Sequence, residues 1–153
     1  MVRTGEIMTR KVISVSEDTS IEDLCGLLYE GRITGAPVVD QEGMLVGIVS
    51  KDDVVGAYFR DRVGDEAAGM KTLLEIGREE APGGEGSGRA RRVGDIMTRE
   101  VVTVTEDTPV KEILHIMVTK GIHRVIVVKD GKVRGIVSAM NVLEALLEDR
   151  LKL

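Results

Sequence analysis

The chain is poor in aromatic residues, cysteine and histidine. Tryptophan is absent, and two tyrosines and one phenylalanine make up 2% of its 153 residues. Because single-stranded nucleic acids stack on aromatic side chains, a base-stacking platform is nearly excluded. The single cysteine, Cys25, forms neither an internal disulfide nor a thiolate metal site by itself. With two histidines and no nucleophile–base–orienter set, the sequence also argues against an enzyme.

Long apolar runs and a basic surplus are missing as well. Runs such as Val125 to Val128 are far shorter than the roughly 20 residues that span a membrane, and the start, MVRTGEIMTRKV, has no apolar core of a secretory signal. The formal charge of −5 argues against nonspecific nucleic-acid binding. The chain is nevertheless 42% hydrophobic and 31% charged, which is typical of a folded domain. We expect a cytoplasmic protein that does not bind membranes.

The main feature of the sequence is an internal repeat. Residues 5–19 read GEIMTRKVISVSEDT and residues 94–108 read GDIMTREVVTVTEDT, so that ten of fifteen positions are identical at an offset of 89. After one residue is lost in a turn, the match continues at an offset of 88 through GIVS at 47–50 and 135–138. Two copies of one unit of about sixty residues are therefore present. We place them at residues 1–62 and 93–153.

Each copy is predicted to fold as β-α-β-β-α. Thr19 caps the first helix of copy one, and Glu22 completes a capping box. In copy two Thr108 is the cap and Pro109 the first helical residue. Apolar residues recur at helical spacing behind these caps, which favours a packing role for Cys25 over a reactive thiol. The predicted strands are 12–15, 36–39 and 45–50 in the first copy and 101–104, 125–128 and 133–138 in the second.

A unit of this size buries too little apolar surface to fold alone. Its aliphatic, β-branched strands predict a sheet covered by helices. We therefore expect an α/β (α+β) fold in which two motifs pack sheet to sheet with pseudo-twofold symmetry. Residues 63–92 form the linker, in which 70–77 suggest a short helix and APGGEGSG at 81–88 is flexible by composition. Arginines 89, 91 and 92 are interpreted as the solvated end of this linker, with an anion site or a nucleic-acid contact as the alternatives.

The motifs of both copies resemble the CBS-domain family, named after cystathionine beta-synthase. They are IMTR-x-V at 7–12 and 96–101, GAPVVD at 35–40, GIVS-x-x-D at 47–53 and GIHRVIVV at 121–128. Two such motifs in tandem resemble a Bateman module, here a stand-alone CBS pair. The resemblance implies binding without a cofactor: AMP, or else ADP, ATP or an S-adenosylmethionine-type compound, lies between the motifs. It also implies a homodimer that relays the bound state to a target protein, which the sequence does not identify.

The resemblance assigns ribose binding to a hydroxyl residue and an aspartate three positions later. Ser50 and Asp53 match this pattern, but the same spacing is also typical of a helix N-cap, and both interpretations stay open. Copy two has Ser138 and Asn141, and asparagine brings no charge to a ribose. The candidate residues of one site are Ser138, Asn141, Ile136, His123 and Arg124, with Ile33, Thr34 and Ala36 along the adenine. Those of the other are Ser50, Asp53, Ile122 and Val125, and Val12 and Val101 are candidate adenine contacts in either.

Phosphate binding is assigned by resemblance to His123 and Arg124, because the planar guanidinium suits a phosphate. Their first-copy counterparts are Thr34 and Gly35, so the site of Asp53 lacks an arginine at this position and has Lys51 as the candidate substitute. The two Met-Thr pairs, 8–9 and 97–98, either pack against the ligand or terminate the sheet. Packing against the ligand is favoured for the methionines, and the role of the threonines stays open. A protein-interaction scaffold with vestigial clefts is the alternative function.

Overall fold

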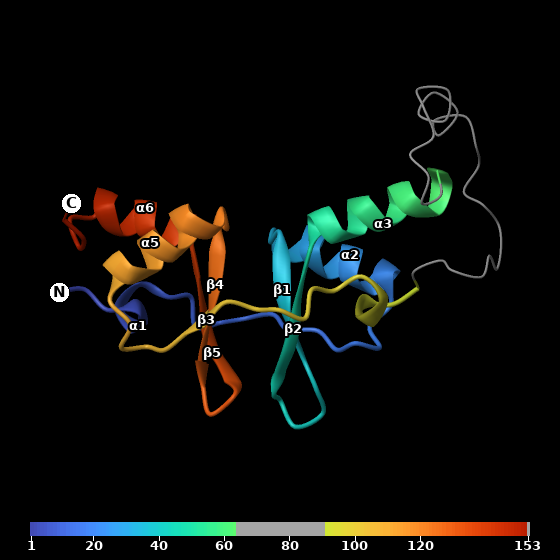
Figure 1. Ribbon diagram of the computed structural model, residues 1–153, viewed down its shortest axis with the longest axis horizontal. Helices are drawn as coiled ribbons and strands as arrows, with labels where there is room; N and C mark the ends of the chain where they lie inside the picture. Colours follow the sequence, from blue (N-terminus) through green and yellow to red (C-terminus); the bar gives the residue numbers. More distant parts are fainter. Residues whose placement is uncertain (64–90, 153) are drawn as a thin grey trace.

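The computed structural model describes residues 1–63 and 91–152, which form two similar units lying side by side (Figure 1). The linker segments predicted at 70–77 and 81–88 lie outside these residues. The first unit consists of α2 (Ile21–Gly31), β1 (Gly35–Val39), β2 (Leu45–Ser50) and α3 (Lys51–Val63). The second consists of β3 (Thr103–Val104), α5 (Val110–Lys120), β4 (Arg124–Lys129), β5 (Lys132–Ser138) and α6 (Ala139–Leu147). Two short helices, α1 (Thr4–Ile7) and η1 (Val93–Asp95), lie at the start of the two copies.

Each unit is built on an antiparallel hairpin, β1–β2 or β4–β5, whose strands end within one residue of the predicted bounds. In the second unit β3 adds a parallel strand beside β4. In the first unit the strand predicted at 12–15 is reduced to one parallel bridge between Val15 and Val38. The predicted β-α-β-β-α order is therefore confirmed for copy two, whereas copy one keeps only this single bridge of its first strand.

The predicted helix caps are wrong by one residue in both copies. Ser20 is the N-cap of α2, and its hydroxyl accepts the N–H of Asp23 at 3.0 Å. Thr19 instead accepts the N–H of Ser16 at 3.1 Å and closes the turn before the helix, a local bond that competes with capping. The corresponding residues of copy two are Pro109 at the N-cap and Thr108, which accepts the N–H of Thr105.

Cys25 does not pack in the core, contrary to the sequence prediction. Its side chain is exposed on α2, whereas Leu24 and Leu28 are buried. The counterpart of Cys25 in α5, Leu114, is only partly buried against its core. The apolar face of these helices is thus narrower than the spacing suggested, and the residue directly after the buried leucine turns toward solvent.

The leading segment of each copy packs on the unit that the other copy forms. Thr9 pairs antiparallel with Ile136 at the free edge of β5, and Thr98 pairs in the same way with Ile48 of β2. Each pair exchanges two backbone hydrogen bonds of 2.8 to 3.0 Å. The chain therefore crosses the molecule twice, once after α1 and once after η1, and this exchange interlocks the two units (Figure 1).

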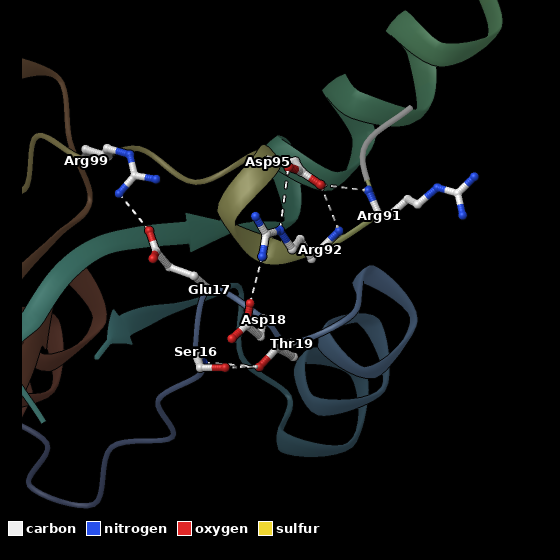
Figure 2. Close-up of polar contacts among 8 residues, drawn as sticks. All are labelled: Ser16, Glu17, Asp18, Thr19, Arg91, Arg92, Asp95 and Arg99. Carbon is white, nitrogen blue, oxygen red and sulfur yellow. Dashed lines mark hydrogen bonds and ion pairs between the residues drawn. The ribbon is translucent and has the colours of Figure 1, made fainter. Parts of the chain in front are cut away.

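Apolar burial follows the same exchange. Ile7 and Met8 belong to the core of the second unit, and Val93 and Ile96 belong to the core of the first. An ion pair stabilises each crossing. The guanidinium of Arg99 lies 2.7 Å from the carboxylate of Glu17 (Figure 2), and the equivalent groups of Arg10 and Glu106 are 3.0 Å apart. The boundaries 1–62 and 93–153 describe the repeat along the sequence, whereas each hydrophobic core takes residues from both sides of them.

The two hairpins face each other across a central seam, with the helices on the outer sides (Figure 1). Side chains alternate along a strand, so Ala36 and Val38 enter the first core, whereas Gly35 faces the seam. In β4 the fully buried Ile126 belongs to neither core, which places it in the seam. At the hairpin tips Met44 and Lys132, which are equivalent in the repeat, form a bridge. The predicted sheet-to-sheet packing with pseudo-twofold symmetry is therefore confirmed.

Candidate functional site

Two cavities lie along the seam and correspond to each other in the repeat. The larger, here called the Asp53 cavity, has a volume of about 570 Å³ and is bounded by the start of α3 and by residues 98–102 and 121–124. The smaller, the Asn141 cavity, has a volume of about 500 Å³ and is bounded by the start of α6 and by residues 9–13 and 32–35. Each cavity therefore combines residues of both copies, as the resemblance implied.

Most of the predicted site residues line these cavities. Three of them, Thr34, His123 and Arg124, line both cavities. Ser50, Asp53, Ile122, Val101 and the proposed substitute Lys51 line the Asp53 cavity. Ser138, Asn141, Ile136, Ile33 and Val12 line the Asn141 cavity.

Two predicted adenine contacts, Ala36 and Val125, lie outside both cavities. They occupy equivalent positions on β1 and β4 and are fully or almost fully buried, with relative exposures of 1% and 0%. The alternation of side chains along a strand directs both of them into the helix-covered cores, away from the seam. The structure thus does not bring them to the site that the resemblance implied.

The two Met-Thr pairs divide between packing and the cavities. A side chain at Gly47 would meet the sulfur of Met97 at 3.0 Å, and one at Gly135 would meet the sulfur of Met8 at 2.7 Å. These glycines therefore permit the close approach of the exchanged segments, and neither methionine is among the residues that line the cavities. The prediction that they pack against a ligand is replaced by packing against the hairpin. The threonines that follow them, at 9 and 98, do line the cavities.

Ser50 and Asp53 form a capping box at the start of α3. The Asp53 carboxylate accepts the N–H of Ser50 at 2.8 Å and its hydroxyl at 3.2 Å, and the Ser50 hydroxyl accepts the N–H of Asp53 at 3.3 Å. The same carboxylate oxygen, Oδ2, takes both bonds from Ser50. The capping interpretation is therefore confirmed, and it fixes a carboxylate rigidly at the cavity wall, where it can accept further hydrogen bonds.

Ser138 and Asn141 repeat this geometry at the start of α6. Oδ1 of Asn141 accepts the N–H of Ser138 at 2.8 Å and its hydroxyl at 3.0 Å. The amide nitrogen of Asn141 donates to the Thr9 hydroxyl at 3.2 Å. Asn141 therefore holds the exchanged segment against α6, and it offers the cavity an uncharged amide where the other cavity has a carboxylate.

Arg124 stands where the two cavities meet. Its guanidinium donates to the Thr34 hydroxyl, and a Cβ atom at Gly35 would collide with the same guanidinium. Gly35 is the counterpart of Arg124 in the repeat, so the glycine of one copy makes room for the arginine of the other. Burial lowers the pKa of Arg124 from its ordinary value, and the negative charge of Asp52 opposes this shift. The resemblance assigns Arg124 to one site only, whereas its side chain lines both cavities.

Four charged lining residues were not among the candidates. Lys11 and Arg32 line the Asn141 cavity, and Asp52 and Glu100 line the Asp53 cavity. Their signal was present in the repeat, because Lys11 corresponds to Glu100 and Arg32 to Gly121, and both exchanges alter charge. Among the described residues, no three histidine, cysteine, aspartate or glutamate side chains are grouped as a metal site would require. Within the same residues no helix is long and apolar enough to cross a bilayer.

Comparisons with known proteins agree with this architecture. MJ1426 of Methanocaldococcus jannaschii is 32% identical over 159 residues, which cover 94% of this chain and 94% of that protein. The chloroplastic CBS domain-containing protein CBSX1 of Arabidopsis thaliana is also 32% identical, over 94% of this chain and 64% of its own length.

Two solved structures with bound adenosyl compounds are similar over nearly the whole chain. CBSX2 of Arabidopsis thaliana in complex with AMP has a TM-score of 0.75 and 27% identity, and the match covers 99% of this chain and all of that one. The CBS domain pair of MJ0100, in complex with 5′-methylthioadenosine and S-adenosyl-L-methionine, has a TM-score of 0.73 and 25% identity over 95% of this chain and 99% of that one. The sequence profile of the CBS domain matches residues 5–60 and 93–148, and the chain belongs to this family.

Proposed function

We propose that this chain is a regulatory module that binds adenine nucleotides or related adenosyl compounds, with AMP as the leading candidate, in the two seam cavities. The observation that carries the proposal is that both cavities are built from both copies around a serine-capped helix start. Similar CBS pairs hold AMP, methylthioadenosine and S-adenosylmethionine. Cavities of about 570 and 500 Å³ also fall in the usual range for small-molecule sites, roughly 300–1,000 Å³.

The cavity walls provide groups for each part of such a ligand. Ile33 and Val12 in one cavity, and Ile122 and Val101 in the other, offer aliphatic surface to an adenine. Burial of about 150 Å² of apolar ligand surface would contribute roughly 4 kcal/mol before ordering costs. Charge-assisted hydrogen bonds to ribose or phosphate would add roughly 1.5–3 kcal/mol each. We therefore expect a dissociation constant in the micromolar range, which corresponds to a binding free energy of about −8 kcal/mol.

Isothermal titration calorimetry with AMP, ADP, ATP, methylthioadenosine and S-adenosylmethionine tests the proposal. We expect at least one of these compounds to bind with micromolar affinity and to raise the unfolding temperature. Asp53→Ala should weaken binding in the Asp53 cavity, since it removes the carboxylate that faces the ribose hydroxyls. The absence of both heat and thermal shift for every compound would refute adenosyl binding.

We further propose that the chain acts as a homodimer on a target protein in the cytoplasm and is not itself an enzyme. Equivalent apolar residues are exposed on the outer helices of both units, Val55 and Phe59 on α3 and Leu143 and Leu147 on α6. Because exposed apolar residues recur at equivalent positions of both units, they support an interface on these helices. Sedimentation velocity checks the dimer, and a monomer at micromolar concentration would contradict it.

A protein-interaction scaffold remains the second candidate function. The hydrogen bond from Asn141 to Thr9 favours it, because it uses a polar group of the cavity to tie down the exchanged segment. A scaffold would capture the same target protein with and without nucleotide. A change in that capture on addition of AMP would instead support the regulatory module.

A further inference from the structure

We propose that the two cavities select ligands of different charge. The Asn141 cavity binds adenosine 5′-phosphates, and the Asp53 cavity binds adenosyl compounds whose 5′ substituent is neutral or cationic, such as a thioether or a sulfonium. This inference rests on the proposed function, since it assumes adenosyl ligands in both cavities. It is carried by the opposite charge of side chains at equivalent positions of the repeat.

The charged side chains of the two walls differ in sign. The Asp53 cavity is lined by the carboxylates of Asp52, Asp53 and Glu100. Apart from Arg124, which lines both cavities, Lys51 is its cationic lining residue among the described residues. The unshared cations of the Asn141 cavity are Lys11 and Arg32, and none of its described lining residues carries a carboxylate. A phosphate is therefore repelled by most of the charges in the first cavity and attracted in the second.

The difference arises position by position rather than from one chance substitution. In the repeat Glu100 corresponds to Lys11, Gly121 to Arg32, Asp52 to Met140 and Asp53 to Asn141. All eight of these residues line the cavity of their own half, and every exchange makes the Asn141 cavity more positive. The single exchange in the other direction, Lys51 against Ala139, offsets only one of the four.

The helix ends add to this asymmetry. The first turn of α3 carries Asp52 and Asp53, which compensate the positive end of the helix dipole. The first turn of α6 has no acidic residue, so its positive end faces the Asn141 cavity without a compensating charge. An anionic group is stabilised beside such an end, and here it also meets Lys11 and Arg32.

Arg124 lines both cavities but does not cancel the difference in charge between their walls. On the side of the Asp53 cavity its guanidinium lies in the field of Asp52. The Asn141 cavity has no lining carboxylate among its described residues to balance the same cation. Arg124 therefore counts as a phosphate-binding group mainly for the Asn141 cavity, where its planar fork suits two phosphate oxygens.

Calorimetry of the full chain at low ionic strength tests the partition with AMP and S-adenosylmethionine. Each compound should bind at one site per chain, and saturating AMP should leave the dissociation constant of S-adenosylmethionine unchanged within about twofold, since separate sites are independent. Methylthioadenosine, which has a neutral thioether, should behave like S-adenosylmethionine. Competition between AMP and both other compounds for one site would overturn the proposal.

Charge-reversal variants show which cavity binds which compound. Each variant introduces the residue that the other copy has at the equivalent position. Lys11→Glu should weaken AMP binding roughly tenfold at low salt and leave S-adenosylmethionine unaffected. Glu100→Lys should have the opposite selectivity. Lys111→Glu is the matched control, because Lys111 is exposed on α5 and lines neither cavity. Circular dichroism and thermal unfolding verify that each variant is folded.

The outcomes separate this inference from the proposed function. If no adenosyl compound binds the wild type, the proposed function itself fails. If the compounds bind but Lys11→Glu and Lys111→Glu weaken AMP equally, adenosyl binding stands and the charge partition is wrong. Independent sites with opposite responses to Lys11→Glu and Glu100→Lys would establish it.

Discussion

At the scale of single residues, Gly35 and Arg124 show how a repeat is made asymmetric. They are equivalent in sequence and meet in the seam, where a Cβ atom at Gly35 would collide with the Arg124 guanidinium and lie 3.0 Å from the carbonyl oxygen of Val49. Two arginines at these positions would place like charges in one small space, which is unfavourable. One arginine opposite one glycine therefore leaves a single guanidinium in the wall shared by the two cavities.

Gly35→Ala is expected to destabilise the protein by about 1–3 kcal/mol, the usual cost of overpacking. Arg124→Ala in the same chain should recover part of this loss, because it removes one of the two groups that the new methyl meets. Urea denaturation of the single and double variants measures the coupling. Gly26→Ala is the matched control, since its new Cβ on α2 would meet no group within 4 Å apart from the adjoining helix backbone, and the change should stabilise by about 0.5–1 kcal/mol. Additive effects of Gly35→Ala and Arg124→Ala would contradict the collision.

The residue scale also shows how far sequence reasoning reached into the site. Ser50, Asp53, Ser138 and Asn141 were assigned to the site by the family resemblance, and their spacing separately predicted the capped helix starts that both copies have. Ala36 and its equivalent on β4 were misplaced, because a run of consecutive apolar residues does not reveal which of them face the helices. Only the pairing of the hairpins across the seam determines that choice.

At the scale of elements, η1 depends on one aspartate. Asp95 accepts the backbone N–H groups of Arg91 at 3.0 Å and Arg92 at 3.2 Å (Figure 2). These two bonds, assisted by the charge of Arg92, lower the pKa of Asp95 from its ordinary value of 3.8. Because the pKa is lower in the folded state, the carboxylate stabilises the fold above its unfolded pKa, and this contribution is lost as the pH falls through the lowered value.

Asp95→Asn should therefore flatten the acid limb of the stability profile. The amide oxygen can still accept both N–H groups, so the variant keeps the turn but no longer titrates there. Urea denaturation from about pH 5 to about pH 2.5 measures the profile. Asp18→Asn removes a carboxylate that contacts the same Arg92 at 2.7 Å without touching the two N–H groups, and it serves as the charge control. A profile of Asp95→Asn parallel to that of the wild type would show that the two N–H bonds do not stabilise the carboxylate form.

Element boundaries were predictable to different degrees. The hairpins and the helices after Ser50 and Ser138 follow from short runs of aliphatic and β-branched residues, turn signals and capping pairs, all of which act locally. The first strand of copy one was overestimated, because its residues have high β-propensity but only Val15 pairs, in one bridge opposite Val38. The β-propensity of single residues does not show whether a segment will find strands to pair with.

At the scale of the whole molecule, the exchange of the leading segments was outside the reach of sequence reasoning. The segments around Ile7 and Ile96 are nearly identical, and the hairpins that receive them are equivalent in the repeat and share the sequence GIVS. Packing within a copy or between copies would therefore bury the same kinds of side chain. The choice depends on chain geometry, and the exchanged arrangement makes each half of the molecule a structural part of the other.

Ile7 and Ile96 are equivalent residues that should destabilise opposite units when truncated. Ile7 has a relative exposure of 6% in the core of the second unit, and Ile96 has 8% in the core of the first. Each Ile→Ala change should cost about 2–5 kcal/mol, because it leaves a cavity in a packed core. Native-state hydrogen exchange locates the loss, since it reports local opening segment by segment. Ile7→Ala should accelerate exchange in α5 and β4 more than in α2 and β1, and Ile96→Ala should do the reverse. If each variant instead loosened the unit formed by its own copy, the two halves would fold separately, and a ligand in the seam would have no exchanged segment through which to couple them.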